Sequence, residues 1–111
     1  MADTFYVSLS VPQAAQILDD AVVRGSVTGE ILDAYGAGAP GGGGFITRVY
    51  EKHYIRAGNR LTLTVVLDDF TGRTRVHCVG GGGGQGLINF DWGAASSFSN
   101  VAANALAAYR I

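Results

Sequence analysis

The chain has 111 residues, of which 48% are hydrophobic and 15% are charged, and its formal net charge is −1. This length and composition predict one globular domain over residues 1–111, and the near-zero charge gives no general attraction to nucleic acid or membranes. No run approaches the roughly 18 apolar residues of a membrane span, and the single cysteine, Cys78, excludes an internal disulfide.

The first part of the chain predicts a strand, a helix and a second strand. Residues 5–10 alternate apolar and polar side chains, as a half-buried strand does. Ser10 and Gln13 have the spacing of a helix capping box, and apolar residues follow at helical spacing. We therefore expect a helix over 11–24 and a weaker strand over 26–35.

The rest of the chain predicts an antiparallel meander followed by a helix. Strands are expected over 45–56, 60–67, 73–79 and 87–92, separated by short turns. A helix is expected over 95–109, where apolar residues recur at i, i+3, i+4 and i+7. The order β-α-β-β-β-β-β-α predicts an α+β fold, with a single antiparallel sheet and the N-terminal and C-terminal helices packed on one face.

The apolar stripe of the last helix also predicts a core. The stripe occupies one side of that helix, and the alternation over 60–67 gives the sheet a matching apolar side. The expected contacts join Phe98, Val101, Leu106 and Tyr109 to Leu61, Leu63, Val65, Leu67 and Val76.

Two glycine-rich segments, GAGAPGGGG at 36–44 and GGGGGQG at 80–86, interrupt these elements. The second contains G-x-G-x-x-G but leads into a predicted strand rather than a helix, and neither is followed by the Gly-Lys-Ser/Thr of a P-loop. A meander places the two segments at opposite ends of the sheet, so they cannot form one phosphate cradle. We expect the first to be a mobile, unconstrained hairpin tip. The final residues of the second are expected to be ordered, either in a bulge or beneath a helix, with a glycine-loop site at Gly82, Gly83, Gly84 and Gln85 as the alternative.

No catalytic, metal or cofactor site is predicted, and nothing nominates an enzyme. His77 and Cys78 are adjacent, so their side chains point to opposite faces of a strand and cannot form a nucleophile–base pair. His53 and His77 lie on different strands without the spacing of a zinc site. Asp68 and Asp69 lie in a turn, where aspartate is expected for local hydrogen bonding.

Basic and aromatic residues gather on one predicted strand face. Segment 45–79 contains six basic and three acidic residues, and the period of two places alternate residues of its strands on one side. Three interpretations stay open: a solvated face, a homodimer surface, or a surface for single-stranded nucleic acid or another polyanion. The candidate binding face comprises Arg48, Tyr50, Lys52, Tyr54, Arg56, Arg73 and Arg75.

The segment LDDFTGRTRVHCVGGGGGQGLINFDWGAASSF resembles small bacterial proteins grouped only as a domain of unknown function, which implies no catalytic residues. In topology the chain is similar to the helix-grip fold of the Bet v 1 and START-like proteins, in which a glycine-rich loop follows the second strand. That resemblance implies a ligand cavity, but this chain is shorter and has one helix after its first strand, which leaves little room for one.

The sequence therefore predicts a small bacterial protein of unknown function that acts as a binding or self-associating module in a reducing cytoplasm. A second copy of the chain is one candidate partner, and neither a cofactor nor a membrane is expected. The alternatives are a polyanion on the candidate binding face and a small ligand between the sheet and the C-terminal helix near a glycine loop.

Overall fold

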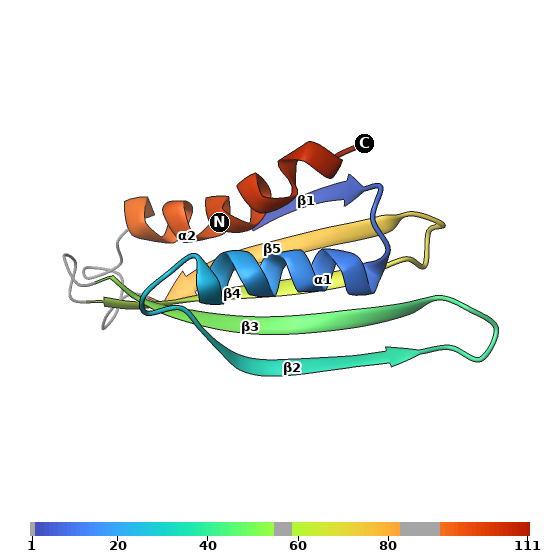
Figure 1. The fold of residues 1–111 in the computed structure, drawn as a ribbon, viewed down its shortest axis with the longest axis horizontal. Coiled ribbons are helices and arrows are strands. Elements are labelled where there is room, and N and C mark those ends of the chain that lie inside the picture. The colour runs from blue at the N-terminus through green and yellow to red at the C-terminus, as the bar shows by residue number, and fades with distance from the viewer. Residues whose placement is uncertain (1, 55–58, 83–91) are drawn as a thin grey trace.

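The computed structural model describes residues 2–54, 59–82 and 92–111 and has the expected α+β architecture. Its helices and strands follow one another as β1 (Ala2–Val7), α1 (Val11–Asp19), the π-helical turn η1 (Asp20–Arg24), β2 (Glu30–Gly38), β3 (Gly44–Tyr54), β4 (Asn59–Asp68), β5 (Thr74–Gly82), α2 (Trp92–Leu106) and the 3-10 turn η3 (Ala107–Tyr109). The two helices and the strands of the described residues form two layers (Figure 1).

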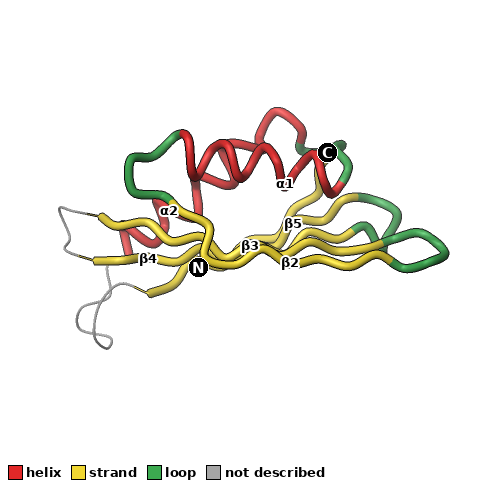
Figure 2. The backbone as a smooth tube through the Cα atoms, turned by 60° about the horizontal axis from the view of Figure 1, so that its bottom comes forward, coloured by secondary structure: helices red, strands yellow, loops and turns green. Residues whose placement is uncertain are grey.

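The strands of the described residues form one antiparallel sheet in the order β1-β5-β4-β3-β2. Strands β2 to β5 follow one another as a meander, and β1 lies beside β5. Both helices lie on the same face of the sheet (Figure 2), with α1 over β3 and β4 and α2 over β5 and β4. The prediction of a single antiparallel sheet with both helices on one face is confirmed.

Several element boundaries differ from the sequence-based expectation: β1 ends at Val7 rather than at residue 10, the α-helix of 11–24 gives way to a π-helical turn after Asp19, and β5 extends to Gly82. β2 begins at Glu30 and continues into the first glycine-rich segment as far as Gly38. α2 begins at Trp92, where the alternation predicts the end of a strand over 87–92. The rest of that expected strand lies outside the described residues.

The N-terminus of α1 is fixed by the predicted capping box. The Ser10 N–H donates to Gln13 Oε1 at 3.0 Å, and the Gln13 N–H donates to Ser10 Oγ at 3.3 Å. Two backbone donors that a helix start leaves without intrahelical partners are thereby satisfied. α1 begins at the end of the sheet where β2 and β3 are joined (Figure 1).

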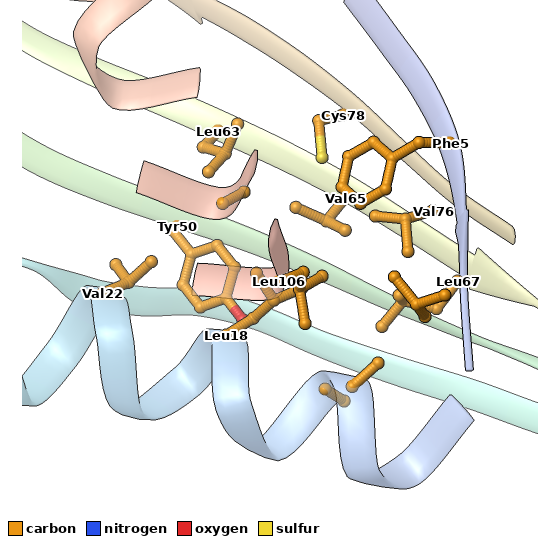
Figure 3. Close-up of a cluster of buried hydrophobic side chains, with 14 of the residues drawn as sticks. Phe5, Leu18, Val22, Tyr50, Leu63, Val65, Leu67, Val76, Cys78 and Leu106 are labelled. Atoms are coloured by element: carbon orange, nitrogen blue, oxygen red, sulfur yellow. The ribbon is translucent and has the colours of Figure 1, made fainter. Parts of the chain in front are cut away.

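The core lies between the helices and the sheet (Figure 3). The α2 stripe is confirmed at Phe98 and Leu106, which are completely buried, and at Val101, which packs against the core. Tyr109 is 38% exposed because the α-helix has already ended in a 3-10 turn. The sheet side of the core includes Phe5, Val7, Leu61, Leu63, Val65, Leu67, Val76 and Cys78.

The two glycine-rich segments lie at opposite ends of the sheet, as the meander predicts. The Gly44 N–H donates to Asp69 Oδ1 at 2.8 Å, which places the first segment beside the β4–β5 turn. Gly82 lies opposite Leu61, at the other end of β4. Three candidate residues of the second segment lie outside the described residues: Gly83, Gly84 and Gln85.

Candidate functional site

The candidate binding face is divided between the two sides of the sheet. Arg48 and Tyr50 of β3 lie opposite Val65 and Leu63 of β4, which are buried under the helices. Residues directly opposite in an antiparallel pair share a face, so Arg48 and Tyr50 belong to the helix-covered side. Arg75 lies on the uncovered side. The expectation that the seven residues share one face is wrong. The β3–β4 register pairs Arg48 and Tyr50 with the buried residues of β4 rather than with its polar residues.

Arg48 and Tyr50 both bind Asp19 of α1. Arg48 Nε donates to Asp19 Oδ1 at 3.0 Å and Nη2 donates to Oδ2 at 3.3 Å, while the Tyr50 hydroxyl donates to Oδ1 at 2.7 Å. Burial, together with the Asp19 carboxylate, raises the pKa of Tyr50 well above its usual value, so Tyr50 remains a neutral donor. In Figure 3 its hydroxyl points toward α1. This cluster fastens α1 to β3 and occupies both side chains.

Arg75 is also engaged, on the uncovered face. Its Nε donates to Asp68 Oδ2 at 3.0 Å, and its Nη2 donates to Asp68 Oδ1 at 3.1 Å. The hydrogen bond and the negative charge of Asp68 raise the pKa of Arg75. Asp68 Oδ1 also accepts from the Phe70 N–H at 3.2 Å. Nearby, Thr4 Oγ1 and His77 Nδ1 are 2.7 Å apart. The guanidinium fork of Arg75 is therefore directed at a carboxylate of the same chain.

The other members of the candidate binding face are dispersed. Lys52 lies opposite Leu61 on the helix-covered side, and Arg73 is exposed in the turn before β5. Tyr54 is the last residue of β3, and Arg56 lies outside the described residues. The structure thus brings Arg48 and Tyr50 together around one carboxylate and does not assemble the seven candidates into one surface.

Strand β2 is an edge of the sheet and is exposed along all nine of its residues. Its apolar residues Ile31, Leu32 and Tyr35 are 39%, 50% and 61% exposed. Because α1 lies over β3 and β4, it leaves much of the helix side of β2 uncovered. The sequence analysis identified only a weak strand here. The missed signal is the adjacent apolar pair Ile31-Leu32, which interrupts the alternation.

The backbone of β2 also presents hydrogen-bonding groups to the outside. The Ala39 N–H donates to Gly43 O at 2.8 Å, which makes these two residues a hydrogen-bonded pair at the base of the hairpin. Hydrogen-bonded and non-hydrogen-bonded pairs alternate along antiparallel strands. The backbone groups of Ala34, Gly36 and Gly38 therefore point away from β3, toward the place of a further strand.

A β-bulge interrupts the pairing of β2 with β3 at Leu32. Ile31 lies opposite Tyr50 and Asp33 lies opposite Val49, so Leu32 is the extra residue. Ile31, opposite Tyr50, lies on the helix side of the sheet, and Asp33, opposite Val49, lies on the uncovered side.

The edge at β1 is different, because the C-terminal residues pair with it. The Ser8 N–H donates to Tyr109 O at 2.8 Å, and the Ile111 N–H donates to Tyr6 O at 3.1 Å. Figure 1 shows the C-terminus beside the end of β1. Part of this edge is thus already satisfied within the chain.

A cleft of about 400 Å³ lies between the start of α1 and the β2–β3 hairpin. Val11 and Pro12 line it from the helix, and Gly36, Gly38 and Ile46 are among the residues that line it from the sheet. This volume lies within the range of small-ligand sites. The cleft adjoins the first glycine-rich segment, as the ligand-site alternative expects, but its helix is the N-terminal α1 rather than the C-terminal helix.

The hairpin at the end of this cleft is constrained by its glycines. Gly42 and Gly43 have φ of +100° and +83°, a region that other residues rarely adopt. A Cβ on Gly44 would come within 2.8 Å of Ala37 O. The Asp69 N–H donates to Gly44 O at 3.3 Å, in addition to the bond that the Asp69 carboxylate accepts. The expectation of an unconstrained tip is therefore wrong.

Neither a metal cluster nor a reactive thiol emerges from the described residues. In that part of the chain no three His, Cys, Asp or Glu side chains are grouped as metal ligands would be. Cys78 is buried in the core, and burial raises the pKa of its thiol to about 12, so the thiol stays protonated. No helix within the described ranges is long and apolar enough to cross a membrane.

Comparison with known proteins gives a family and no activity. No curated protein and no solved structure matches the chain, so the likeness to the helix-grip fold stays a prediction. A family of unknown function, DUF6054, matches residues 1–110. This match covers nearly the whole chain and agrees with the resemblance to small proteins grouped as a domain of unknown function. The chain belongs to the family of unknown function DUF6054.

Proposed function

We propose that this protein is a self-associating module in which two copies pair edge to edge through β2. The observation that supports this most is the exposure of β2 over nine residues, with backbone groups directed away from β3. An unpaired edge is a template for another strand, and strand addition is a recurrent mode of recognition. A second copy offers the same strand, and a strand that pairs antiparallel with itself forms a closed two-fold dimer.

The charges of β2 are compatible with this pairing. The strand carries Glu30 and Asp33 and no lysine or arginine. If the two-fold axis passes near the middle of the strand, at Ala34 or Tyr35, neither carboxylate lies directly opposite its counterpart in the other copy. Like charges would be destabilising if they were directly opposite. The remaining diagonal repulsion is screened by salt, so added salt should strengthen the dimer.

The compartment that we propose is the cytoplasm of a bacterium. The support is the chemistry of Cys78, a buried free thiol and the single cysteine of the chain, which suits a reducing environment. We do not extend the proposal to polyanions, because Arg48 is engaged by Asp19 and Arg75 by Asp68.

Sedimentation equilibrium tests the pairing. The wild-type chain is expected to show a concentration-dependent monomer–dimer equilibrium. Ala34→Pro removes an N–H that points away from β3, so it should abolish the dimer while the β2–β3 pairing remains. Ala34→Val keeps that N–H and is the matched control, expected to dimerise as the wild type does. A wild-type chain that remains monomeric at millimolar concentration would contradict the proposal.

A further inference from the structure

The symmetry of an antiparallel β2–β2 pair fixes which faces of the two sheets meet. A two-fold axis that relates two neighbouring antiparallel strands runs perpendicular to the sheet, so the helices of both copies lie on the same side. Residues directly opposite each other share a face. The uncovered side of one copy therefore continues into the uncovered side of the other, and the residue on the axis lies opposite its own counterpart.

The two sides of β2 differ in the side chains that they offer to such a pair. Gly36 lies opposite Ile46, which packs against the core, so Gly36 belongs to the helix side, together with Ala34 and Gly38. These three residues are too small to give much contact. Tyr35 lies on the uncovered side and is 61% exposed. It has the largest side chain of the residues of β2 that follow the bulge.

The orientation of Tyr35 is fixed by contacts within its own chain. Its ring contacts the ring of Phe45, with centroids 5.8 Å apart and planes inclined at 49°. Thr47 lies opposite Tyr35, and the Thr47 hydroxyl donates to Tyr35 O at 3.4 Å. Because the backbone groups of Ala34 and Gly36 point outward, those of Tyr35 point toward β3. In a β2–β2 pair Tyr35 thus has a non-hydrogen-bonded position, where opposite Cα atoms are closest, about 4.5 Å apart.

We propose that Tyr35 lies on the two-fold axis of the dimer and contacts Tyr35 of the second copy. This inference rests on the edge-to-edge pairing proposed above. The rings of Tyr35 and Phe45 and those of the second copy then form one aromatic row across the interface. Aromatic pairs are attractive at centroid separations of about 4.5–7 Å, and tyrosine is enriched among the residues that carry most of the affinity of interfaces.

The carboxylates of β2 favour this register over one centred at Ala34. With the axis at Ala34, Asp33 lies diagonally across from Asp33 of the second copy, on the same face. With the axis at Tyr35, the two carboxylates are four residues apart along the strands, about 13 Å, which exceeds the Debye length of about 10 Å at 0.1 M salt. An axis at Gly36 would instead set each Tyr35 opposite Ala37, which is a smaller contact.

Substitutions at Tyr35 test the contact by its effect on the dissociation constant of the dimer. Tyr35→Ser should weaken dimerisation by roughly 10- to 100-fold, because it removes both rings at the centre of the interface. Tyr35→Phe keeps the ring and should stay within about threefold of the wild type. Phe70 is equally exposed, at 61%, but lies in the β4–β5 turn, so Phe70→Ser is the matched control and should leave the dissociation constant unchanged. Equal effects of the two serine variants would contradict the contact.

Cysteine cross-linking tests the position of the axis. Tyr35→Cys places two thiols on residues whose Cα atoms are about 4.5 Å apart, within the range of about 4.4–6.8 Å that disulfides span. Ala37→Cys is the matched control on the same face, because its two copies would lie about 13 Å apart. Cys78 does not compete, since it is buried. With oxidised glutathione, we expect a covalent dimer of Tyr35→Cys, and none of Ala37→Cys, on non-reducing gel electrophoresis.

The same assay separates this inference from the pairing itself. Adding Ala34→Pro to Tyr35→Cys should abolish the cross-link, because the strands no longer pair. A wild-type dimer that Ala34→Pro abolishes, but in which Ala34→Cys cross-links and Tyr35→Cys does not, would overturn the Tyr35 contact and preserve the edge pairing. A monomeric wild-type chain would overturn both.

Discussion

The two edge strands of the sheet differ in how their backbone groups are used. β1 carries buried Phe5 and Val7, and residues 109–111 pair with it through main-chain hydrogen bonds. β2 is longer, has no buried residue, and pairs with β3 alone among the described strands. Proteins commonly protect their edges because an open edge invites pairing with other chains. Here residues 109–111 protect part of the β1 edge, whereas β2 is exposed along its whole length.

Removing the protection of β1 should produce the largest change. Deletion of residues 109–111 frees the Ser8 N–H and the Tyr6 carbonyl, so both edges become available for pairing. We expect the mass in analytical ultracentrifugation to exceed that of a dimer as concentration rises. The same deletion combined with Ala34→Pro should stop at a dimer, because β1 is then the remaining open edge. A deletion variant that stays dimeric would show that β1 needs no protection.

The centre of the sheet should respond to truncation far more than its β2 edge does. Leu63 is completely buried on β4, and Leu63→Ala should lower the free energy of unfolding by about 2–5 kcal/mol. Leu32→Ala, measured in the monomeric Ala34→Pro background, should change it by less than about 0.5 kcal/mol because half of that side chain is exposed. Urea denaturation followed by circular dichroism measures both. A loss at Leu63 below about 0.5 kcal/mol would contradict its place in the core.

Asp19 fastens α1 to β3, because its carboxylate accepts hydrogen bonds from Arg48 and Tyr50. Asp19→Ala leaves the largely buried Arg48 and Tyr50 without their acceptor, and should cost about 1–3 kcal/mol of unfolding free energy. Asp20→Ala is the matched control at the next position. Its carboxylate is 45% exposed and lies 3.7 Å from Arg24, so its loss should cost less than about 0.5 kcal/mol. Equal costs would mean that the Asp19 cluster does not fasten the helix.

The elements of this fold are predictable from short-range patterns, and the candidate site is not. The capping box at Ser10 and the alternation through Leu61 and Leu63 are local signals, and both are confirmed. The side on which Arg48 lies depends on the β3–β4 register, which one residue in the turn can reverse. The bulge at Leu32 likewise follows from pairing with β3, since tertiary pairing rather than local propensity decides where a strand irregularity falls.

The hairpin that carries the β2 edge offers the finest comparison, because two of its glycines, Gly41 and Gly43, should respond differently to the same change. Gly43 has a φ of +83°, so Gly43→Ala forces a side chain into a left-handed conformation and should cost about 1–2 kcal/mol of unfolding free energy. Gly41 has no positive φ and no atom within 4 Å of an added Cβ. Gly41→Ala should therefore be neutral, or stabilising by up to about 1 kcal/mol, since alanine restricts the unfolded chain.

Thermal denaturation of both variants in the Ala34→Pro background measures the fold of the single chain without a contribution from pairing. The difference between the two glycines separates a hairpin held by its backbone from one whose glycines are interchangeable. If Gly43→Ala were as harmless as Gly41→Ala, the tip would be unconstrained, and β2 would lose the rigid support that a pairing edge needs. A loss of unfolding free energy at Gly43 alone would link the conformation of the β2 edge to the β4–β5 turn. The reason is that the N–H of the next residue, Gly44, donates to the Asp69 carboxylate in that turn.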